Sequence, residues 1–283
     1  MAVNFNVAGD IAAYVNTIYE DALLVLRDNM LATSLVQVYT DQSGTATRSL
    51  EEYGTATINQ VSDADDLSSQ AFTPSNLSTL APTEKGAQFL LTDLRVETDP
   101  FPVRQQAATE LGMAMAEKID TDVFGNFSSL TGGTVGASGS AISWSYVFNM
   151  MSLLRAQKAP RPWRLVLHPY QWGTLGKAAS VAGSSTNAPE YLTAQIARNF
   201  FIQNTSGIDI FITTNVQTSG TDAYAALFSP MAMVYDQRRA VRLEPERDAS
   251  RRAWELNLTA VYGHGVWRPK FGVQGIFDNT APS

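Results

Sequence analysis

The final third of the chain constrains the fold most strongly, because three β-rich segments follow one another there with only short turns between them. The first covers residues 223–235 and leads into an arginine-rich stretch, the second covers 260–269, and the third covers 270–278. Glycine and proline lie between the apolar runs, where they favour turns. Short turns predict a mainly antiparallel sheet. None of the three segments has the residues that catalysis requires.

Composition limits the class of protein. The chain has 283 residues, of which 45% are hydrophobic, so it can bury a sizeable core in one large domain or two small ones. It has no cysteine, which excludes disulfides and thiolate metal sites and fits a reducing cytoplasm or a protein indifferent to redox state. The first residues do not have the pattern of a signal peptide. There is no run of about 18 apolar residues, so we expect no membrane span.

The charge is unevenly distributed along the chain. Residues 1–99 contain 14 acidic and 4 basic residues, a net charge of −10, and the remainder contains 13 acidic and 16 basic residues, a net charge of +3. This division argues against nucleic-acid binding over the whole surface. It suits a self-associating protein in which the acidic arm of one copy lies on the basic body of another. Ordinary surface solvation explains the charge equally well.

Residues 1–40 predict a helical arm with Asp10 as its N-cap. An amphipathic helix must bury its apolar face, here either on the chain's own core or on a neighbouring subunit, and the sequence leaves both open. The apolar residues close to helical spacing are Ile11, Tyr14, Val15, Ile18, Leu23, Leu24, Leu31 and Leu35.

Residues 41–100 predict a hairpin that projects from the body. A turn-forming cluster lies at 41–45, and an acidic, loop-like stretch lies at the centre, at 61–69. Extended but largely polar stretches flank this centre at 45–58 and 85–97, and neither has the pattern of a buried strand. Such a ribbon is marginal alone and is understandable where a partner covers it. The alternative is a long irregular surface loop, although structureless loops of this length are uncommon in compact domains.

Residues 101–127 predict the longest helix. Pro100 and Pro102 lie at its start, where a missing backbone N–H costs little. At about 1.5 Å per residue the helix is on the order of 35 Å long, which suits a spine for several packed layers. Its unbroken i, i+4 stripe favours close packing over a cofactor pocket and consists of Val103, Ala107, Leu111, Met115, Ile119 and Val123.

The middle of the chain predicts mixed α and β structure. Residues 128–141 are rich in glycine and serine and predict a flexible linker or loop. Ser143 is the expected cap of a helix that Pro160 and Pro162 end. The elements expected after it are a buried strand at 164–168, a helix from about Tyr170, a loop at 183–189, a short helix at 191–200, a strand at 208–216 and a turn at 217–222.

Neither histidine has a spacing that predicts chemistry. His168 ends the buried strand, and His264 lies between two glycines in an expected β turn. No nucleophile elbow accompanies them, and no zinc-binding spacing connects them. We expect both to be structural.

The acidic pairs are equally unpromising as catalysts. Glu51 and Glu52, like Asp65 and Asp66, lie in polar, loop-like sequence, where nothing predicts the burial that shifts a catalytic pKa. With Asp63, the second pair predicts a solvated acidic tip, since the rest of a calcium loop is missing. We therefore expect no catalytic residue, no cofactor and no metal site.

Arginines cluster between 238 and 252. Because acidic residues alternate with them, we expect salt bridges within or between subunits, with contact to DNA phosphates as the second interpretation. Exposed ion pairs are individually worth about 0–1 kcal/mol, so only a repeated network would matter. The arginines are Arg238, Arg239, Arg242, Arg247, Arg251 and Arg252, and the acids are Glu244, Glu246 and Asp248.

Three segments, in their order along the chain, carry a resemblance to a known family. They are Trp-Arg-Leu-Val-Leu-His-Pro-Tyr-Gln-Trp at 163–172, Leu-Phe-Ser-Pro-Met-Ala at 227–232 and Tyr-Gly-His-Gly-Val-Trp-Arg-Pro at 262–269. With the arm, hairpin and long helix before them, they resemble the major capsid proteins of tailed bacteriophages. The resemblance covers nearly the whole chain, and its specificity comes from the order of elements.

The resemblance implies an α+β, Hong Kong 97-type capsid fold with an N-terminal arm, an extended β-hairpin loop, a long spine helix, and peripheral and axial domains. By analogy, residues 1–47 form the arm, 48–98 the extended loop (E-loop), and 99–139 the first part of the peripheral domain with the spine helix. Residues 140–220 form the axial domain, and 221–283 the closing strands of the peripheral domain.

The function implied is that of a major capsid (coat) protein, which self-assembles as hexamers and pentamers into the icosahedral head that encloses the double-stranded DNA genome of a phage. It would not be an enzyme. An encapsulin-type compartment shell, which shares the fold, is the alternative. An enzyme of unfamiliar type is a second rival, disfavoured by the two histidines and the absence of cysteine.

The resemblance also implies partners and a location. The chain would contact further copies of itself, a portal, a decoration protein in some systems, and packaged DNA on the inner surface without sequence specificity. A separate scaffolding protein is expected because the arm starts almost at Met1. The protein would be assembled in the host cytoplasm and reside in the virion. The candidate inter-subunit contact residues are Glu51, Glu52, Asp65, Asp66, Lys85, Arg238, Arg239, Arg242, Arg251 and Arg252; Lys85 is also a candidate for a covalent crosslink, although no matching motif accompanies it.

Overall fold

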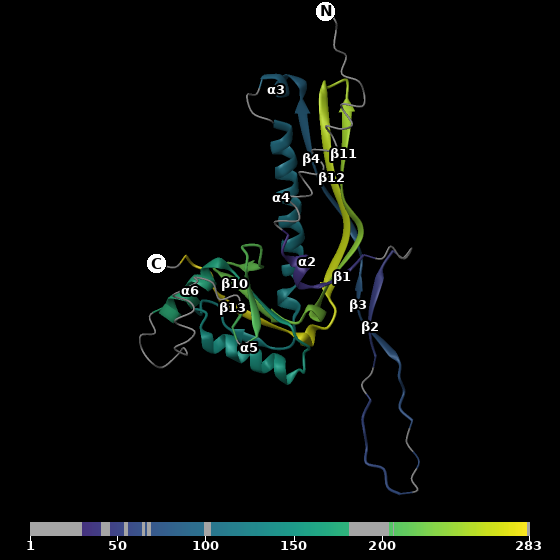
Figure 1. Ribbon diagram of the computed structural model, residues 1–283, viewed down its shortest axis with the longest axis vertical. Coiled ribbons are helices and arrows are strands. Elements are labelled where there is room, and N and C mark those ends of the chain that lie inside the picture. Colours follow the sequence, from purple (N-terminus) through teal and green to yellow (C-terminus); the bar gives the residue numbers. More distant parts are fainter. Residues whose placement is uncertain are drawn as a thin grey trace, which may run out of the picture.

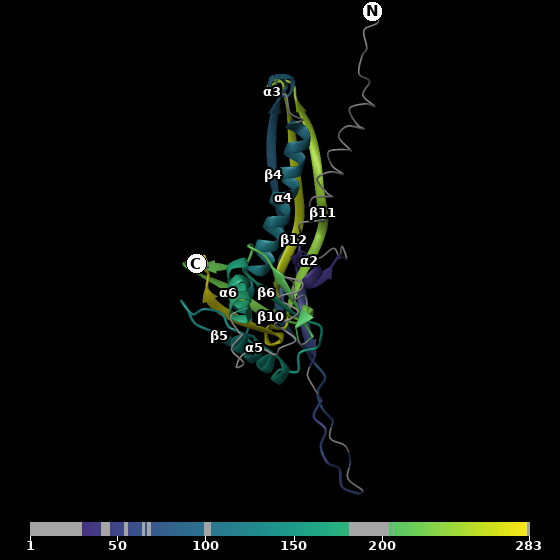
Figure 2. The ribbon, with the colours of Figure 1, turned by 60° about the vertical axis from the view of Figure 1, so that its left-hand side comes forward.

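The computed structural model describes residues 30–40, 46–53, 56–63, 66, 69–98, 103–180, 204–205 and 207–281. Most of the predicted arm helix, Asp65, and the loop and helix predicted over 183–200 lie outside these residues. The described chain is elongated and has three parts (Figures 1 and 2). A long, narrow sheet has a helix along it, a broader α/β unit lies at one end of that sheet, and a thin hairpin projects beyond that end.

Two long antiparallel strands, β11 and β12, form the centre of the narrow sheet. β12 pairs on its other side with antiparallel β4, and the start of β11 pairs with parallel β1. Alternate residues of β12 from Leu256 to Tyr262 are buried, which is the period of a strand with one covered face. The strands are β1 (Gln37–Tyr39), β4 (Thr83–Thr92), β11 (Met233–Asp248) and β12 (Ala253–Val266).

β11 contains two irregularities in its pairing with β12. One extra residue of β11 lies between Gln237 and Arg239, and another lies between Arg239 and Arg242. Such β-bulges bend a strand and increase its twist, and both strands curve along their length in Figure 1. The bulges also change which arginines of β11 share a face, so a simple period of two does not predict their sides.

The predicted spine helix is confirmed as α4 (Val103–Phe124), which lies along the covered face of the narrow sheet. It packs in one core with Leu256, Leu258 and Tyr262 of β12. The short helix α3 (Asp93–Thr98) precedes it, and the 3-10 turn η1 (Phe127–Ser129) follows it. The predicted stripe is the buried face, because Ala107, Leu111, Met115, Ile119 and Val123 are all buried and Val103 is partly buried.

The broader unit is built on a second, mixed sheet with the order β5-β13-β10-β6-β8-β7, and β9 pairs with the start of β10. Nearly every residue of β10 is buried, as expected for a strand in the middle of a sheet that is covered on both faces. The helices predicted after Ser143 and near Tyr170 are confirmed as α5 (Trp144–Ala156) and α6 (Pro169–Ser180). The strands are β5 (Thr134–Gly136), β6 (Trp163–Leu167), β7 (Asn204–Thr205), β8 (Ile208–Ile212), β9 (Thr218–Ser219), β10 (Asp222–Phe228) and β13 (Gly272–Asp278).

The prediction of a flexible linker over 128–141 was wrong in part. Residues 134–136 form β5, which pairs in parallel with β13. The glycines there permit close packing: a Cβ on Gly132 would lie 2.5 Å from two backbone carbonyl oxygens. Gly136 has a φ of +81° and lies against Phe277, where a side chain would be both strained and crowded. Glycine composition therefore indicated a loop where the structure uses glycine for contact.

The projecting hairpin pairs differently from the prediction. Its strands are β2 (Arg48–Tyr53) and β3 (Pro74–Leu80). The stretch at 85–97, expected as the second strand, instead forms most of β4 and α3, and β4 pairs with β12. The loose alternation in 85–97 indicated a strand correctly, but it could not identify the strand's partner.

His264 lies within β12, paired with Tyr235 of β11, rather than in the β turn that its two flanking glycines predicted. The chain turns later, at η3 (Pro269–Phe271), which connects β12 to β13. A matching turn, η2 (Pro230–Ala232), connects β10 to β11.

We expect Leu111→Ala to lower the free energy of unfolding by about 2–5 kcal/mol, because it removes buried atoms between α4 and the narrow sheet. Met113→Ala is the matched control: Met113 lies on the same helix and is 46% exposed, so its loss should change stability by less than about 0.5 kcal/mol. Urea unfolding of the purified chain, followed by circular dichroism, measures both. Equal losses in the two variants would contradict the packing described.

Candidate assembly interface

The projecting hairpin exposes large apolar side chains. Ile58 is 96% exposed and Phe72 is 71% exposed. Phe72 stacks on Tyr53 across the hairpin, with ring centroids 4.9 Å apart and an interplanar angle of 16°. Beyond the paired strands, the side chain of Gln70 makes two hydrogen bonds to the backbone of Thr57. The hairpin is therefore held together internally while its apolar groups face solvent.

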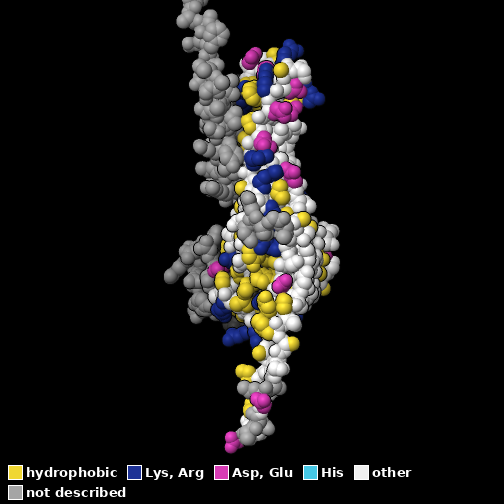
Figure 3. All heavy atoms as spheres, turned by 90° about the vertical axis from the view of Figure 1, so that its right-hand side faces the viewer, with side chains coloured by type: hydrophobic (Ala, Val, Ile, Leu, Met, Phe, Trp, Pro, Cys, Tyr) yellow, Lys and Arg dark blue, Asp and Glu magenta, His cyan; other side chains and the backbone are white. Residues whose placement is uncertain are grey.

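The root of the hairpin packs on the face of the narrow sheet opposite α4. Leu50 and Leu80 form a small buried cluster with Val234 of β11. The indole Nε1 of Trp267 donates a hydrogen bond to the carbonyl oxygen of Glu51, at 3.3 Å. Figure 3 shows hydrophobic side chains around this root and along the hairpin, with acidic and basic side chains mixed on the narrow sheet above.

Two glycines of β12 make room for the root. A Cβ on Gly265 would lie 2.6 Å from a methyl carbon of Leu80, and a Cβ on Gly263 would lie 3.3 Å from the backbone of Pro82. The Gly-His-Gly pattern that indicated a turn in the sequence therefore marks a close approach of two chain segments.

Asp236 lies at the same place and is fully buried. Its carboxylate is 3.2 Å from Nε of Arg48 on β2 and 2.8 Å from Nε of Arg238 on β11. The two guanidinium groups supply positive charge that a buried carboxylate requires.

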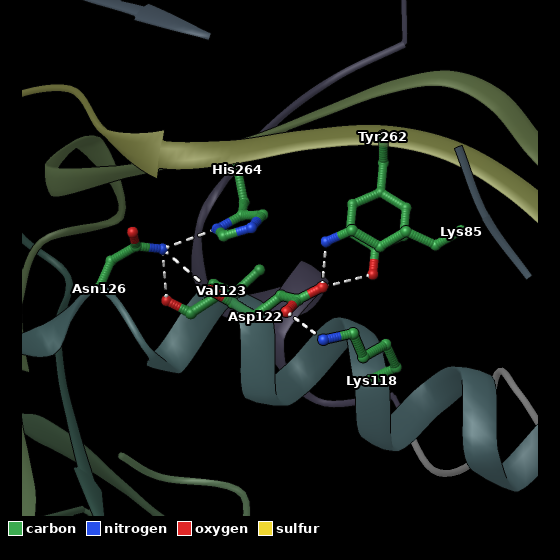
Figure 4. A network of polar contacts seen from close by, with 7 residues as sticks. All are labelled: Lys85, Lys118, Asp122, Val123, Asn126, Tyr262 and His264. Atoms are coloured by element: carbon green, nitrogen blue, oxygen red, sulfur yellow. Dashed lines mark hydrogen bonds and ion pairs between the residues drawn. The ribbon is translucent and has the colours of Figure 1, made fainter. Parts of the chain in front are cut away.

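A second polar network connects α4 to the sheet around Asp122 (Figure 4). The carboxylate of Asp122 accepts hydrogen bonds from the Tyr262 hydroxyl at 2.7 Å, from Lys118 Nζ at 2.9 Å and from Lys85 Nζ. Burial acts to raise the pKa of Asp122, but the three donors outweigh it and hold the pKa below its usual value. Burial and the hydrogen bond to Asp122 raise the pKa of Tyr262.

Asn126 extends this network to His264. Its Nδ2 lies 3.0 Å from Nδ1 of His264 and also donates to the carbonyl oxygens of Asp122 and Val123 at the end of α4. Burial lowers the pKa of His264, although the Asp122 carboxylate opposes this effect. His264 therefore favours its neutral form, which can accept from Asn126.

A third acidic residue, Asp120, holds the start of α2 (Ala32–Leu35) on the spine helix. Asp120 of α4 accepts hydrogen bonds from the backbone N–H of Ala32 at 2.8 Å and of Leu31 at 3.2 Å. These groups lie at the N-terminal end of α2 (Ala32–Leu35), where backbone donors lack partners within the helix. Burial raises the pKa of Asp120, and these hydrogen bonds act in the opposite direction.

The predicted contact residues separate into three groups. Glu51, Glu52 and Asp66 lie on the hairpin, where Glu52 is 3.9 Å from Arg268. Lys85 faces α4 from β4. The arginines lie along β11 and in the turn after it, and most are paired within the chain: Arg238 with Asp236, Arg239 with Glu84, Arg242 with Glu244 at 2.6 Å, and Arg251 with Asp248 at 3.5 Å and Glu255 at 3.7 Å. The side chain of Arg252 lies exposed in that turn. Contact between any of these residues and a second copy of the chain stays a prediction.

The buried acids Asp120 and Asp236 and the partly buried Asp122 were not predicted from the sequence. A signal for them existed: Asp120 and Asp122 interrupt the apolar surface of the longest helix, and Asp236 follows directly on an apolar strand.

Within the described ranges, no group of three or more acidic or histidine side chains could hold a metal ion. In the same part of the chain, every helix is too short or too polar to cross a bilayer.

We expect the stability of the chain to fall as the pH drops below about 6.5. Burial lowers the pKa of both His264 and His168, so the unfolded chain takes up more protons than the folded chain in this range. The stabilisation is complete above the unfolded pKa and is lost as the pH falls toward the folded pKa.

Urea midpoints between about pH 7.5 and 5.5 measure this loss. His264→Gln should reduce the dependence on pH, and His168→Gln/His264→Gln should reduce it further, since the chain has no other histidine. A double variant with the pH dependence of the wild type would show that buried histidines are not its cause.

The fold resembles solved structures of viral and virus-like shells. A capsid structure of the cyanophage P-SCSP1u has 13% sequence identity, with 89% of each chain covered and a TM-score of 0.66. A structure of Mycobacterium phage Che8 has 19% identity, covers 89% of this chain and 92% of the other, and has a TM-score of 0.64. A virus-like particle from Pyrococcus furiosus has 11% identity, covers 92% and 97%, and has a TM-score of 0.61. At these identities the likeness is one of fold.

No curated protein matches the chain in sequence. A family model described as phage capsid protein matches residues 76–274, a span that includes β4, the spine helix α4, both long strands of the narrow sheet and nearly all of the second sheet. Because this match covers well over half of the chain, the chain belongs to the phage capsid protein family.

Proposed function

We propose that copies of this phage major capsid protein join as hexamers and pentamers and close into an icosahedral shell around the double-stranded DNA genome of a phage. The observation that carries the proposal is the hairpin of β2 and β3. It extends away from the chain's own core with large apolar groups in solvent, and a second copy of the chain is the surface that would cover them.

Energetic considerations support this use of the hairpin. A two-stranded ribbon alone is marginally stable in water, and exposed apolar groups such as Ile58 and Phe72 gain on the order of 25 cal/mol for each Å² that a neighbour covers. One contact of this size is weak. Repeated around each ring and across the shell, it stabilises the assembly, so subunit stability and assembly are linked.

The parts of the chain fit a Hong Kong 97-type division with altered boundaries. We propose that the extended loop covers residues 48–80 rather than 48–98, because β4 pairs within the narrow sheet. That sheet with α4 would form the peripheral domain. The second sheet with α5 and α6 would form the axial domain, which would then include β10 and β13 as well as residues 140–220. Residues 1–47 would remain the N-terminal arm.

The same proposal includes partners beyond the chain itself. A scaffolding protein, a portal, a decoration protein and packaged DNA are expected from the resemblance to tailed-phage capsid proteins. Contact with DNA would be independent of sequence and located on the inner surface. Assembly would take place in the host cytoplasm, and the mature protein would reside in the virion without enzymatic activity.

An encapsulin-type compartment is the second candidate, because the chain shares its fold with a virus-like particle as well as with phage capsids. We rank it lower because the matched family is a phage capsid family. The nucleic acid content of shells purified from the native source decides between them. Nuclease-resistant double-stranded DNA supports the phage head, and protein cargo without DNA supports the compartment.

We expect the double variant Ile58→Ser/Phe72→Ser to fold but to assemble poorly, because it removes apolar surface that has no role in the chain's own core. Circular dichroism and thermal unfolding should match the wild type. Size-exclusion chromatography and negative-stain electron microscopy should show unassembled subunits in place of shells and rings.

The matched control is Ile58→Val/Phe72→Leu, which keeps both positions apolar and should assemble. Normal shell yield from the serine variant would contradict the role of the hairpin. Failure of both variants to fold would instead show that these side chains stabilise the subunit.

A further inference from the structure

We propose that Asp236, Arg48 and Arg238 form a joint that fixes the direction in which the hairpin projects, and that through this joint they determine how one copy meets the next. The second half of this inference rests on the proposed contact between the hairpin and a neighbouring copy. The first half concerns the single chain and stands independently.

The three charges connect the hairpin to the body. Arg48 is the first residue of β2, and Asp236 lies on β11 beside Tyr39, the last residue of β1. The chain therefore leaves the narrow sheet after Tyr39 and returns at Arg48 to the same carboxylate. Each oxygen of Asp236 faces a different guanidinium: Oδ1 faces Arg48 of the hairpin, and Oδ2 faces Arg238 of the sheet.

An aromatic ring also contacts the guanidinium of Arg48. Its Cζ lies 4.6 Å from the ring centroid of Tyr39, and Tyr39 makes an edge-to-face contact with Trp267 at 6.4 Å. A planar guanidinium that contacts both a ring and a carboxylate has little freedom to turn. Arg48, the first residue of β2, is thus fixed in orientation as well as in position.

Apolar packing at the root cannot fix this direction by itself. The contacts of Leu50 and Leu80 with Val234 hold the hairpin against the sheet, but hydrophobic attraction is not directional. An ion pair inside the molecule is different, because a rotation that moves Arg48 away leaves one oxygen of the desolvated carboxylate with no charge facing it, while Arg238 still faces the other. The apolar cluster therefore holds the root on the sheet, and the carboxylate, together with the hydrogen bond from Trp267 to Glu51, selects one orientation of it.

The length of the hairpin amplifies any change at the root. Ten residues separate Asp63 from Tyr53, the last residue of β2. At about 3.3 Å per extended residue, a chain of this length reaches on the order of 30 Å. A turn of about 10° at the root then moves the tip by about 5 Å over this reach. That displacement exceeds the distance of about 4 Å between side-chain atoms in contact. Small errors at the joint would therefore misplace Ile58 and Phe72 on a neighbour.

The absence of cysteine makes a direct test simple. Ser69→Cys near the hairpin tip and Ser128→Cys on the body place spin labels at two exposed positions. Pulsed dipolar spectroscopy on the unassembled fraction, diluted with unlabelled chain, then reports the distance between hairpin and body. We expect a single narrow distance peak for the wild type and loss of that peak in Arg48→Met, which keeps the length of the side chain but removes its charge.

Two further variants keep the test decisive. Asp236→Asn should also lose the narrow peak, and it serves as the second test if Arg48→Met does not fold. Arg242→Met is the matched control. Arg242 lies on β11, as Asp236 does, and forms an ion pair with Glu244 in which both side chains are about half exposed. The wild-type peak should therefore remain in this variant. A wild-type distance distribution in every folded variant of Arg48 and Asp236 would overturn the joint.

Shell assembly of the same variants separates the joint from the proposed function. Loss of the peak together with few or misshapen shells supports both. Loss of the peak with normal shells supports the joint and contradicts a role for the hairpin's direction in assembly. A retained peak with failed assembly overturns the joint, while the serine variants of the hairpin still test the proposed function.

Discussion

The pairing of β11 with β12 is the constraint on which the rest of the molecule depends, because each face of this pair holds a different part. On one face Leu258 and Tyr262 pack against the spine helix. On the other face Gly263 and Gly265 receive the root of the hairpin. Neighbouring residues of a strand point to opposite faces, so a register error of one residue would turn Tyr262 outward and place a glycine under α4. The spine helix and the hairpin are therefore fixed relative to each other by one strand register.

Besides the long path from β4 through α4 to β5, two short crossings connect the two sheets. The chain passes from β10 to β11 through η2 and returns from β12 to β13 through η3. Backbone hydrogen bonds join the crossings: Ser229 N–H donates to Phe271 at 3.0 Å, and Trp267 N–H donates to Ala232 at 2.8 Å. Single linkers between domains permit relative motion by default, whereas two crossings bonded to each other restrict it. The body can therefore present the hairpin and both sheets to its neighbours as one unit.

The sequence predicted those elements whose pattern is local. The i, i+4 stripe of α4 and the apolar run of β6 were confirmed because helix and strand periods depend on neighbouring residues. The partner of β2 was predicted wrongly, since both 74–80 and 85–97 can be extended and only the long-range pairing of β4 with β12 distinguishes them. The glycines near β5 were interpreted as a flexible loop and those in β12 as a turn, because composition does not reveal which chain segment packs against a glycine. The acids were missed because burial of Asp236 depends on Arg48, almost 190 residues earlier in the sequence.

A common physical device holds the appended segments on the body. Asp120 accepts from the backbone at the start of α2, Asp122 connects α4 to β4 and β12, and Asp236 connects the hairpin to β11. A fourth acid, Asp222, accepts from Gly139 N–H at 2.9 Å and holds the loop after β5 to β10. In each case apolar packing supplies attraction without direction, and a shielded carboxylate with two or more hydrogen-bond or ion-pair partners permits one arrangement. A subunit that must fit identical neighbours on several sides needs such defined arrangements, since errors in one copy are repeated at every contact that the copy makes.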